Sequence, residues 1–142
     1  MNSSHASDVV EIQQLLAHYA VNMTKDDVDK AVEVFAPDAT FSSFGHTRGL
    51  ADFVLSTKNA AAGIFITGPA AITVDGDTAR GEQPMCFVDQ KTHDTLIGWY
   101  TDTFRRTGEG WRVQTRQLTF LRRSGARDGG QPTNTVTGEP LT

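Results

Sequence analysis

Residues 8–44, DVVEIQQLLAHYAVNMTKDDVDKAVEVFAPDATFSSF, decide the fold. Ile12, Leu16, Tyr19 and Met23 recur in this stretch at spacings of four, three and four, which is the apolar stripe of an amphipathic helix. Tyr19 differs from the other three because its hydroxyl needs a hydrogen-bond partner when it is buried. We therefore expect a first helix that closes a sheet formed by the rest of the chain, with Tyr19 as a polar group in the interior.

A second helix is expected to follow the first after a tight turn. Asp8 with Glu11 resembles an N-terminal capping pair for the first helix, and Thr24 with Asp27 repeats the pattern for the second. Pro37 ends the second helix, because the residue before a proline is pushed out of helical geometry.

Downstream, the sequence predicts a strand over residues 39–44 and a short helix over residues 50–58. From residue 64 the apolar period changes to two, which is typical of strands. Two hairpins are expected, one with strands 70–74 and 78–88 around the turn Asp75-Gly76-Asp77, and one with strands 95–106 and 111–123 around residues 107–110. The order predicts an α+β domain with helices against one face of a curved antiparallel sheet.

Length and composition bound the possibilities further. The 142 residues fit one domain, which we place at residues 8–123 between a loose terminus at 1–7 and a flexible tail at 124–142. The net charge of -4 argues against a nucleic-acid partner. Cys86 is the single cysteine, and neither a secretory signal nor an apolar run long enough for a membrane span is present, so a cytoplasmic protein is expected.

Three segments carry a resemblance to a known family: HYAVNMTKDDVDKAVEVFAPDATF (18–41), VDGDTA (74–79) and GWYTDTFRRTGEGWRVQTR (98–116). They resemble the nuclear transport factor 2-like superfamily, and within it the SnoaL-like polyketide cyclase and ketosteroid isomerase-like group. The resemblance implies a cone-shaped barrel in which three N-terminal helices pack on a strongly curved, mostly antiparallel sheet around a hydrophobic pocket. It also implies a homodimer formed through the outer face of the sheet.

Two residues match the oxyanion hole of ketosteroid isomerase in this resemblance. Tyr19 stands at the position of its helix-one tyrosine, and Asp102 at that of an acid held protonated by an apolar site. Independently, Tyr100, Asp102 and Phe104 share one face of a strand under period two, so Asp102 is expected to be desolvated between aromatic rings. A neutral acid there could donate a hydrogen bond to an oxyanion. The alternative is a structural pair in which Asp102 satisfies the hydroxyl of Tyr19.

The sequence lacks the base that such enzymes carry at the matching positions. Ser43 and Thr24 stand where relatives carry acids, and Ile64 stands where dehydratases carry a histidine. His46 is the best substitute base, because its ordinary pKa lies near neutrality, although a solvated loop histidine is the competing interpretation. Glu82 is a second acid–base candidate if it faces the pocket. Gly81 and Pro84 invite a bulge that leaves its direction open.

The last strand supplies further candidates for contact with a substrate. Trp111, Thr115 and Gln117 are expected to line the pocket, with Arg112, Arg116 and Leu118 outside. The full set of expected substrate-binding residues is Phe41, Phe53, Glu82, Tyr100, Phe104, Trp111, Thr115 and Gln117, beside the catalytic candidates Tyr19, Asp102 and His46.

The function expected from these residues is an isomerase, cyclase or lyase without cofactor or metal. Its substrate would be a hydrophobic, carbonyl-bearing molecule, steroid- or polyketide-like, and the reaction would pass through an enol or enolate. The alternative is a dimeric binding or accessory protein without chemistry, and a structural dimerisation domain is a third possibility. The four histidines and one cysteine show no metal-ligand spacing.

Overall fold

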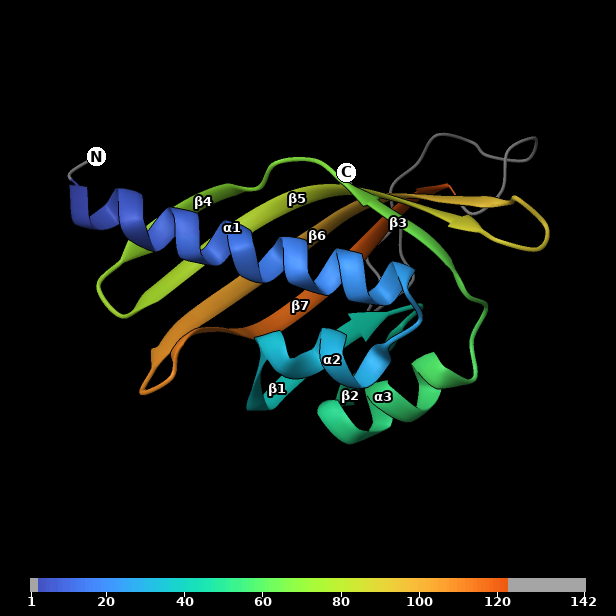
Figure 1. Cartoon of the computed structure of the whole chain (residues 1–142), viewed down its shortest axis with the longest axis horizontal. Helices are drawn as coiled ribbons and strands as arrows, with labels where there is room; N and C mark the ends of the chain where they lie inside the picture. The colour runs from blue at the N-terminus through green and yellow to red at the C-terminus, as the bar shows by residue number, and fades with distance from the viewer. Residues whose placement is uncertain (1–2, 123–142) are drawn as a thin grey trace.

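The computed structural model describes residues 3–122, which form helices followed by a long meander of strands (Figure 1). In chain order the elements are α1 (Ser3–Thr24), α2 (Val28–Ala31), the 3-10 turn η1 (Val32–Val34), β1 (Phe35–Ser43), β2 (His46–Gly49), α3 (Leu50–Lys58), β3 (Gly63–Thr67), β4 (Ala71–Asp75), β5 (Thr78–Asp89), β6 (Thr95–Thr107) and β7 (Gly110–Arg122). The predicted tail at 124–142 lies outside the described residues.

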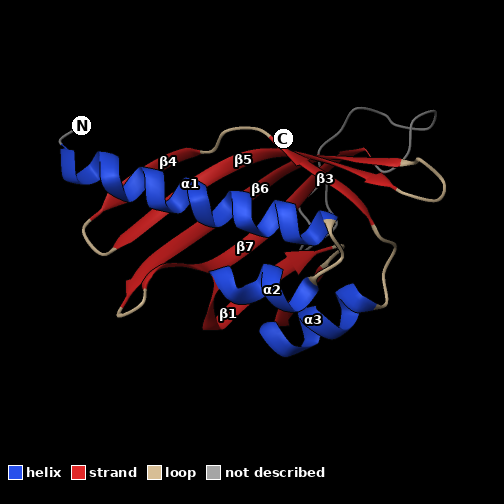
Figure 2. Cartoon of the chain, in the orientation of Figure 1, coloured by secondary structure: helices blue, strands red, loops and turns tan. Residues whose placement is uncertain are grey.

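The strands form one seven-stranded sheet in the order β2-β1-β7-β6-β5-β3, with β4 pairing to β5 beyond the end of β3. All pairings are antiparallel except β1 with β7. Helix α1 runs across one face of the sheet, and α2 and α3 lie beside it near β1 (Figures 1 and 2). The predicted α+β fold, with three helices on a mostly antiparallel sheet, is confirmed, although the sheet is open rather than closed into a barrel.

Helix α1 buries the predicted stripe. Ile12, Leu16, Tyr19 and Met23 are all at most 6% exposed and pack against the inner face of the sheet. The helix starts at Ser3, within the segment that was expected to be loose, and so earlier than the predicted start at Asp8. Asp8 therefore lies inside the helix, not at its cap.

The turn after α1 also differs in detail from the sequence prediction. Asp27 alone caps α2, since its side chain accepts a hydrogen bond from the Lys30 amide. The Thr24 hydroxyl instead accepts from the amide of Phe65 and ties the end of α1 to β3. The helical segment ends at Val34, and Pro37 lies inside β1, in a stretch where the pairing with β7 is irregular.

A β-bulge in β7 overturns one prediction. Phe104 pairs with Val113, and Thr103 pairs with Thr115, so Gln114 is an extra residue without an opposite partner. Because side chains alternate along a strand, one extra residue reverses which of the following side chains face inward.

The consequence is that the expected orientation of β7 is wrong beyond the bulge. Arg116 and Leu118, expected outside, are buried, at 1% and 7% exposure. Thr115, expected to line the pocket, is exposed, and Gln117 lies on the same outward side of the strand. A strict period of two along the whole strand predicts the opposite orientation, because the alternation of residues carries no signal for the bulge.

Within residues 3–122, no helix is both long enough and apolar enough to cross a membrane.

Candidate functional site

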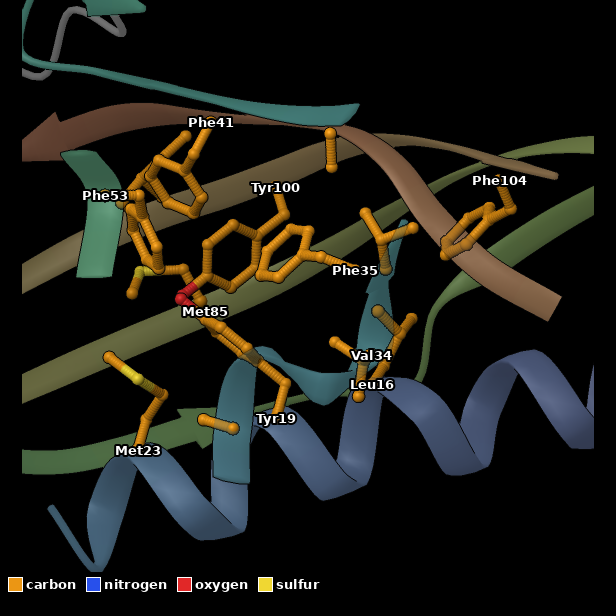
Figure 3. Packing of buried hydrophobic residues seen from close by; sticks show 14 of the residues in the cluster. Leu16, Tyr19, Met23, Val34, Phe35, Phe41, Phe53, Met85, Tyr100 and Phe104 are labelled. Atoms are coloured by element: carbon orange, nitrogen blue, oxygen red, sulfur yellow. The ribbon is translucent and has the colours of Figure 1, made fainter. Parts of the chain in front are cut away.

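An apolar cavity of about 290 Å³ lies between the C-terminal half of α1, α3 and the inner face of the sheet. Its wall is mostly aromatic and aliphatic, and Phe41 on β1 stacks on Phe53 of α3 with ring centroids 4.3 Å apart. Met23 and Met85 approach from opposite sides (Figure 3). The wider hollows elsewhere are grooves lined largely by exposed polar side chains, so this cavity is the candidate ligand site.

Two phenols supply polar groups to this cavity. Tyr19 comes from α1 and Tyr100 from β6, with ring centroids 6.3 Å apart and planes perpendicular (Figure 3). Burial raises the pKa of Tyr19 well above its ordinary value and raises the pKa of Tyr100 to about 12. Both side chains are therefore neutral near pH 7 and able to donate a hydrogen bond to a ligand.

Arg116 lies behind the two phenols. Its guanidinium carbon is 3.4 Å from the ring centroid of Tyr100 and 4.7 Å from that of Tyr19, which is cation–π geometry. The side chain is 1% exposed and lies outside the described lining of the cavity. Sequence reasoning missed it, because the signal that turns it inward is the bulge at Gln114.

Asp102 is bound to Arg116. Arg116 Nε donates to Oδ1 of Asp102 at 2.9 Å and Nη2 donates to Oδ2 at 3.2 Å, while Nη2 also donates to Gln83 Oε1 at 3.0 Å. Gln83 Nε2 in turn donates to the carbonyl of Gly68. These contacts hold the guanidinium through Nε and Nη2.

Asp102 lies where the sequence predicted, but its hydrogen-bond partner differs from the expected one. The prediction that it is buried beside Tyr100 and Phe104 is confirmed, since all three are 1% exposed. Burial raises the pKa of Asp102, but Arg116 opposes this by its charge and its hydrogen bonds. Both carboxyl oxygens of Asp102 accept hydrogen bonds from the guanidinium, so they are engaged with Arg116 rather than directed at an oxyanion. Among the described residues, its bonded partner is Arg116 and not Tyr19.

Asp26 is a site residue that sequence reasoning missed. It follows α1 with a φ of 59°, a left-handed conformation that Asp tolerates better than most residues. This conformation places Asp26 in the lining of the cavity, and as an exposed residue it lies at the rim. The signal in the sequence was the polar turn TKDD (24–27), which places two acids directly after the first helix.

The other predicted acid–base residues lie elsewhere. His46 is exposed on β2, opposite Ser43, and is not part of the described cavity lining, so its expected position at the pocket is wrong. Glu82 of β5 is exposed and lies opposite Thr101 of β6, on the outer side of the sheet. Its neighbour Gln83 is the residue that faces inward.

The remaining predicted contact residues divide in the same way. Phe41, Phe53 and Tyr100 line the cavity as expected. Phe104 and Trp111 are buried but lie outside its described lining, and the Trp111 indole N–H donates to Asp8. Thr115 and Gln117 face outward, and the Thr115 hydroxyl lies 2.6 Å from that of Thr103. Within residues 3–122, no three side chains of His, Cys, Asp or Glu are grouped to hold a metal ion.

The profile of the SnoaL-like domain matches residues 4–117, most of the chain. The chain belongs to the SnoaL-like domain family. An uncharacterised relative, Rv2910c of Mycobacterium tuberculosis strain H37Rv, is 31% identical over 128 residues, covering 82% of this chain and 87% of the relative.

Solved structures agree on the fold. An NTF2-like protein with a cystatin-like fold from Novosphingobium aromaticivorans superposes with a TM-score of 0.74 at 25% identity, covering 86% of this chain and 87% of the other. A protein of the same organism, proposed to be a scytalone dehydratase, superposes with a TM-score of 0.75 at 13% identity, covering 90% and 95%. At that identity the second likeness shows the shared fold alone.

The cavity of this SnoaL-like domain combines two neutral donors with one carboxylate. The phenols of Tyr19 and Tyr100 can hold an oxygen atom of a ligand, and the Asp26 carboxylate at the rim can accept a proton. The rest of the wall is suited to a hydrocarbon skeleton.

Proposed function

We propose that this SnoaL-like domain is a cofactor-free enzyme that moves a proton next to a carbonyl group of a compact, hydrophobic molecule. The reaction class is isomerisation, cyclisation or elimination through an enol or enolate. One observation carries the proposal: Tyr19, Tyr100 and Asp26 line the same, otherwise mostly apolar cavity. The family contains proteins of several activities, so the argument depends on these residues and not on the fold.

The two phenols would bind the carbonyl oxygen. As the carbon–hydrogen bond beside the carbonyl breaks, its electron pair moves toward that oxygen, which gains negative charge. Hydrogen-bond donors fixed in a water-poor site stabilise such charge far more than they do in water. The raised pKa values of Tyr19 and Tyr100 keep their protons in place for this task.

Asp26 would accept the proton. A carboxylate with access to solvent at the rim can take a proton from the substrate carbon and return it to another carbon of the same skeleton or to water. Asp26 thus replaces His46, which lies away from the cavity, as the proposed base.

The cavity size narrows the substrate. At about 290 Å³ it lies at the lower end of ligand pockets, which span roughly 300–1,000 Å³. A ketone of one or two fused rings, such as a polyketide fragment, suits this volume better than a large steroid derivative.

Solvent deuterium exchange tests the chemistry without knowledge of the natural product. The protein is incubated in D2O with 2-tetralone, a bicyclic ketone, and loss of the α-hydrogen signal is followed by NMR against the uncatalysed rate. Wild type is expected to accelerate exchange. Tyr19→Phe or Tyr100→Phe should lower the rate roughly 10–100-fold, and Asp26→Asn about 100-fold or more, because donors and base act on the same step.

Asp27→Asn is the matched control. Asp27 neighbours Asp26 but lies outside the described cavity lining and caps α2, a role that Asn fills equally well, so exchange should be unchanged. Wild-type exchange rates in Asp26→Asn and in both phenylalanine variants would refute the mechanism.

A binding protein without chemistry is the second candidate. It is favoured by the neutralisation of Asp102 by Arg116, which removes the acid expected to assist the oxyanion. Under this alternative, 2-tetralone would stabilise the protein in thermal unfolding while wild type left the exchange rate at its uncatalysed value.

A further inference from the structure

Both tyrosines of the protein lie against one buried cation. The sequence contains two tyrosines, Tyr19 and Tyr100, and the Arg116 guanidinium contacts the faces of both rings at 4.7 and 3.4 Å. The phenols line the cavity, whereas Arg116 lies outside its described lining. Burying a guanidinium is costly, and hydrocarbon would fill the same volume more cheaply.

The position of Arg116 is fixed by polar contacts rather than by packing alone. Asp102 accepts hydrogen bonds from Nε and Nη2 of Arg116, and Gln83 accepts a second hydrogen bond from Nη2. Asp102 is also the counter-charge of the pair, at the same depth in the protein. The rings of Tyr19 and Tyr100 are therefore in direct contact with the positive charge of Arg116. The negative charge of Asp102 lies behind it, on the residue that is bonded to Arg116.

The two charges act on the phenols in opposite directions. Arg116 stabilises negative charge on the phenol oxygens or on an atom that they bind, whereas Asp102 disfavours it. The other charged group placed at the cavity is Asp26 at the rim, which also disfavours negative charge. Each phenol is also a titratable neighbour of the other, with ring centroids 6.3 Å apart.

We propose that Arg116 and Asp102 are positioning residues that together set the donor strength of the Tyr19 and Tyr100 hydroxyls, and with it how tightly the cavity holds a ligand oxygen that carries negative charge. The ligand class that responds to this pair is an enolate or phenolate, whereas a neutral molecule of the same shape does not respond. The inference rests on the proposed function for the identity of the site. It adds that this response originates in two residues outside the described lining of the cavity.

Tyrosine titration in the free protein tests the inference directly. Because the chain has no other tyrosine, the ultraviolet absorbance of tyrosinate, or a tyrosine Cζ NMR signal, reports this cluster alone. In Asp102→Asn the cation is uncompensated, so both phenols should titrate roughly one to two pH units lower than in wild type. In the double variant Asp102→Asn/Arg116→Gln the cation is gone, and the phenols should titrate above those of Asp102→Asn by a similar amount.

A coloured ligand provides the second measurement. 4-Nitrophenolate should bind Asp102→Asn roughly tenfold more tightly than wild type and the double variant more weakly than Asp102→Asn. 4-Nitrotoluene, a neutral molecule of similar shape, should bind all three proteins with affinities within about twofold. A change in packing alone would alter the affinity for both ligands, so this comparison separates charge from packing.

The inference is overturned if the phenols of Asp102→Asn titrate as in wild type. It is equally overturned if the two variants titrate alike, because Arg116 would then act by packing only. Should the double variant not fold, the comparison of wild type with Asp102→Asn still decides. None of these titrations requires turnover, so a failure of deuterium exchange would count against the proposed function and leave this test intact.

Discussion

At the scale of single residues, the buried pair of Arg116 and Asp102 is the least ordinary feature of the molecule. Both side chains are 1% exposed, and each has lost the water that would otherwise solvate its charge. Their hydrogen bonds offset that loss only while both partners are present. Removing one charge is thus expected to cost far more than removing both.

Arg116→Met is predicted to destabilise the protein by about 3–5 kcal/mol, because it leaves the Asp102 carboxylate buried without its partner. Urea unfolding followed by circular dichroism measures this. The double variant Asp102→Asn/Arg116→Met should lose less than the sum of the losses in Asp102→Asn and Arg116→Met. Arg80→Met, an exposed arginine on β5, is the control and should stay within about 0.5 kcal/mol of wild type. Strict additivity of the two buried substitutions would contradict the account.

The sequence predicted part of this site. The stripe of α1 and the alternation of β6 correctly predicted that Tyr19, Tyr100 and Asp102 are buried on facing elements. The sequence could not predict that Arg116 is the partner of Asp102. The bulge at Gln114 turns Arg116 inward, and a bulge depends on strand pairing rather than on a distinctive residue type. Asp26 was missed for a similar reason, since its position depends on one left-handed φ angle.

At the scale of elements, α1 is attached to the sheet by polar contacts at its N-terminal half. Asp8 accepts from the Trp111 indole and from two nitrogens of Arg106, and Glu11 accepts from the Trp111 amide at 2.6 Å. The spacing of Asp8 and Glu11 suggested a helix cap, but two residues that are three positions apart also lie on the same face of a helix. Here that face meets the β6–β7 hairpin.

Asp8→Asn is predicted to lower the melting temperature near pH 7 by about 3–6 °C through loss of the charged contact with Arg106. Hydrogen bonds from Arg106 and Trp111 hold the pKa of Asp8 below its ordinary value of 3.8. The stabilisation from this carboxylate is therefore complete above that value and lost as the pH falls through the lower, folded-state pKa.

Melting curves at several pH values check the sign of the effect. The difference between wild type and Asp8→Asn should shrink as the pH falls below 3.8. Asp52→Asn, at an exposed position of α3, serves as a control and should show no such trend. A difference that grows in acid would rule out the proposed role of Asp8.

At the scale of the whole molecule, the sequence predicted the order of elements well. Helix α3 and the four strands of the two hairpins begin and end within one residue of their predicted limits, because turns rich in Gly and Asp separate runs of period two. The short helical segment before β1 was predicted less well, and the parallel contact of β1 with β7 has no local signal. Such long-range pairing is set by the sheet as a whole.

The expected homodimer stays a prediction. The outer face of the sheet presents Ile64 and Ile66 on β3, at 45% and 51% exposure. If two copies associate through this face, Ile66→Glu should shift sedimentation toward the monomer, while Leu55→Glu, at an exposed position of α3, should not. A monomeric wild type would contradict the expectation.

The extra residue in β7 makes the interior of this protein sensitive to chain length at one position. Deleting Gln114 would restore strict alternation and exchange the two sides of the strand from there onward. Thr115 and Gln117 would turn inward, and the guanidinium now stacked on the two phenols would face water. A single codon lost at this point would therefore take the cation out of the interior and leave the Asp102 carboxylate buried there without its partner.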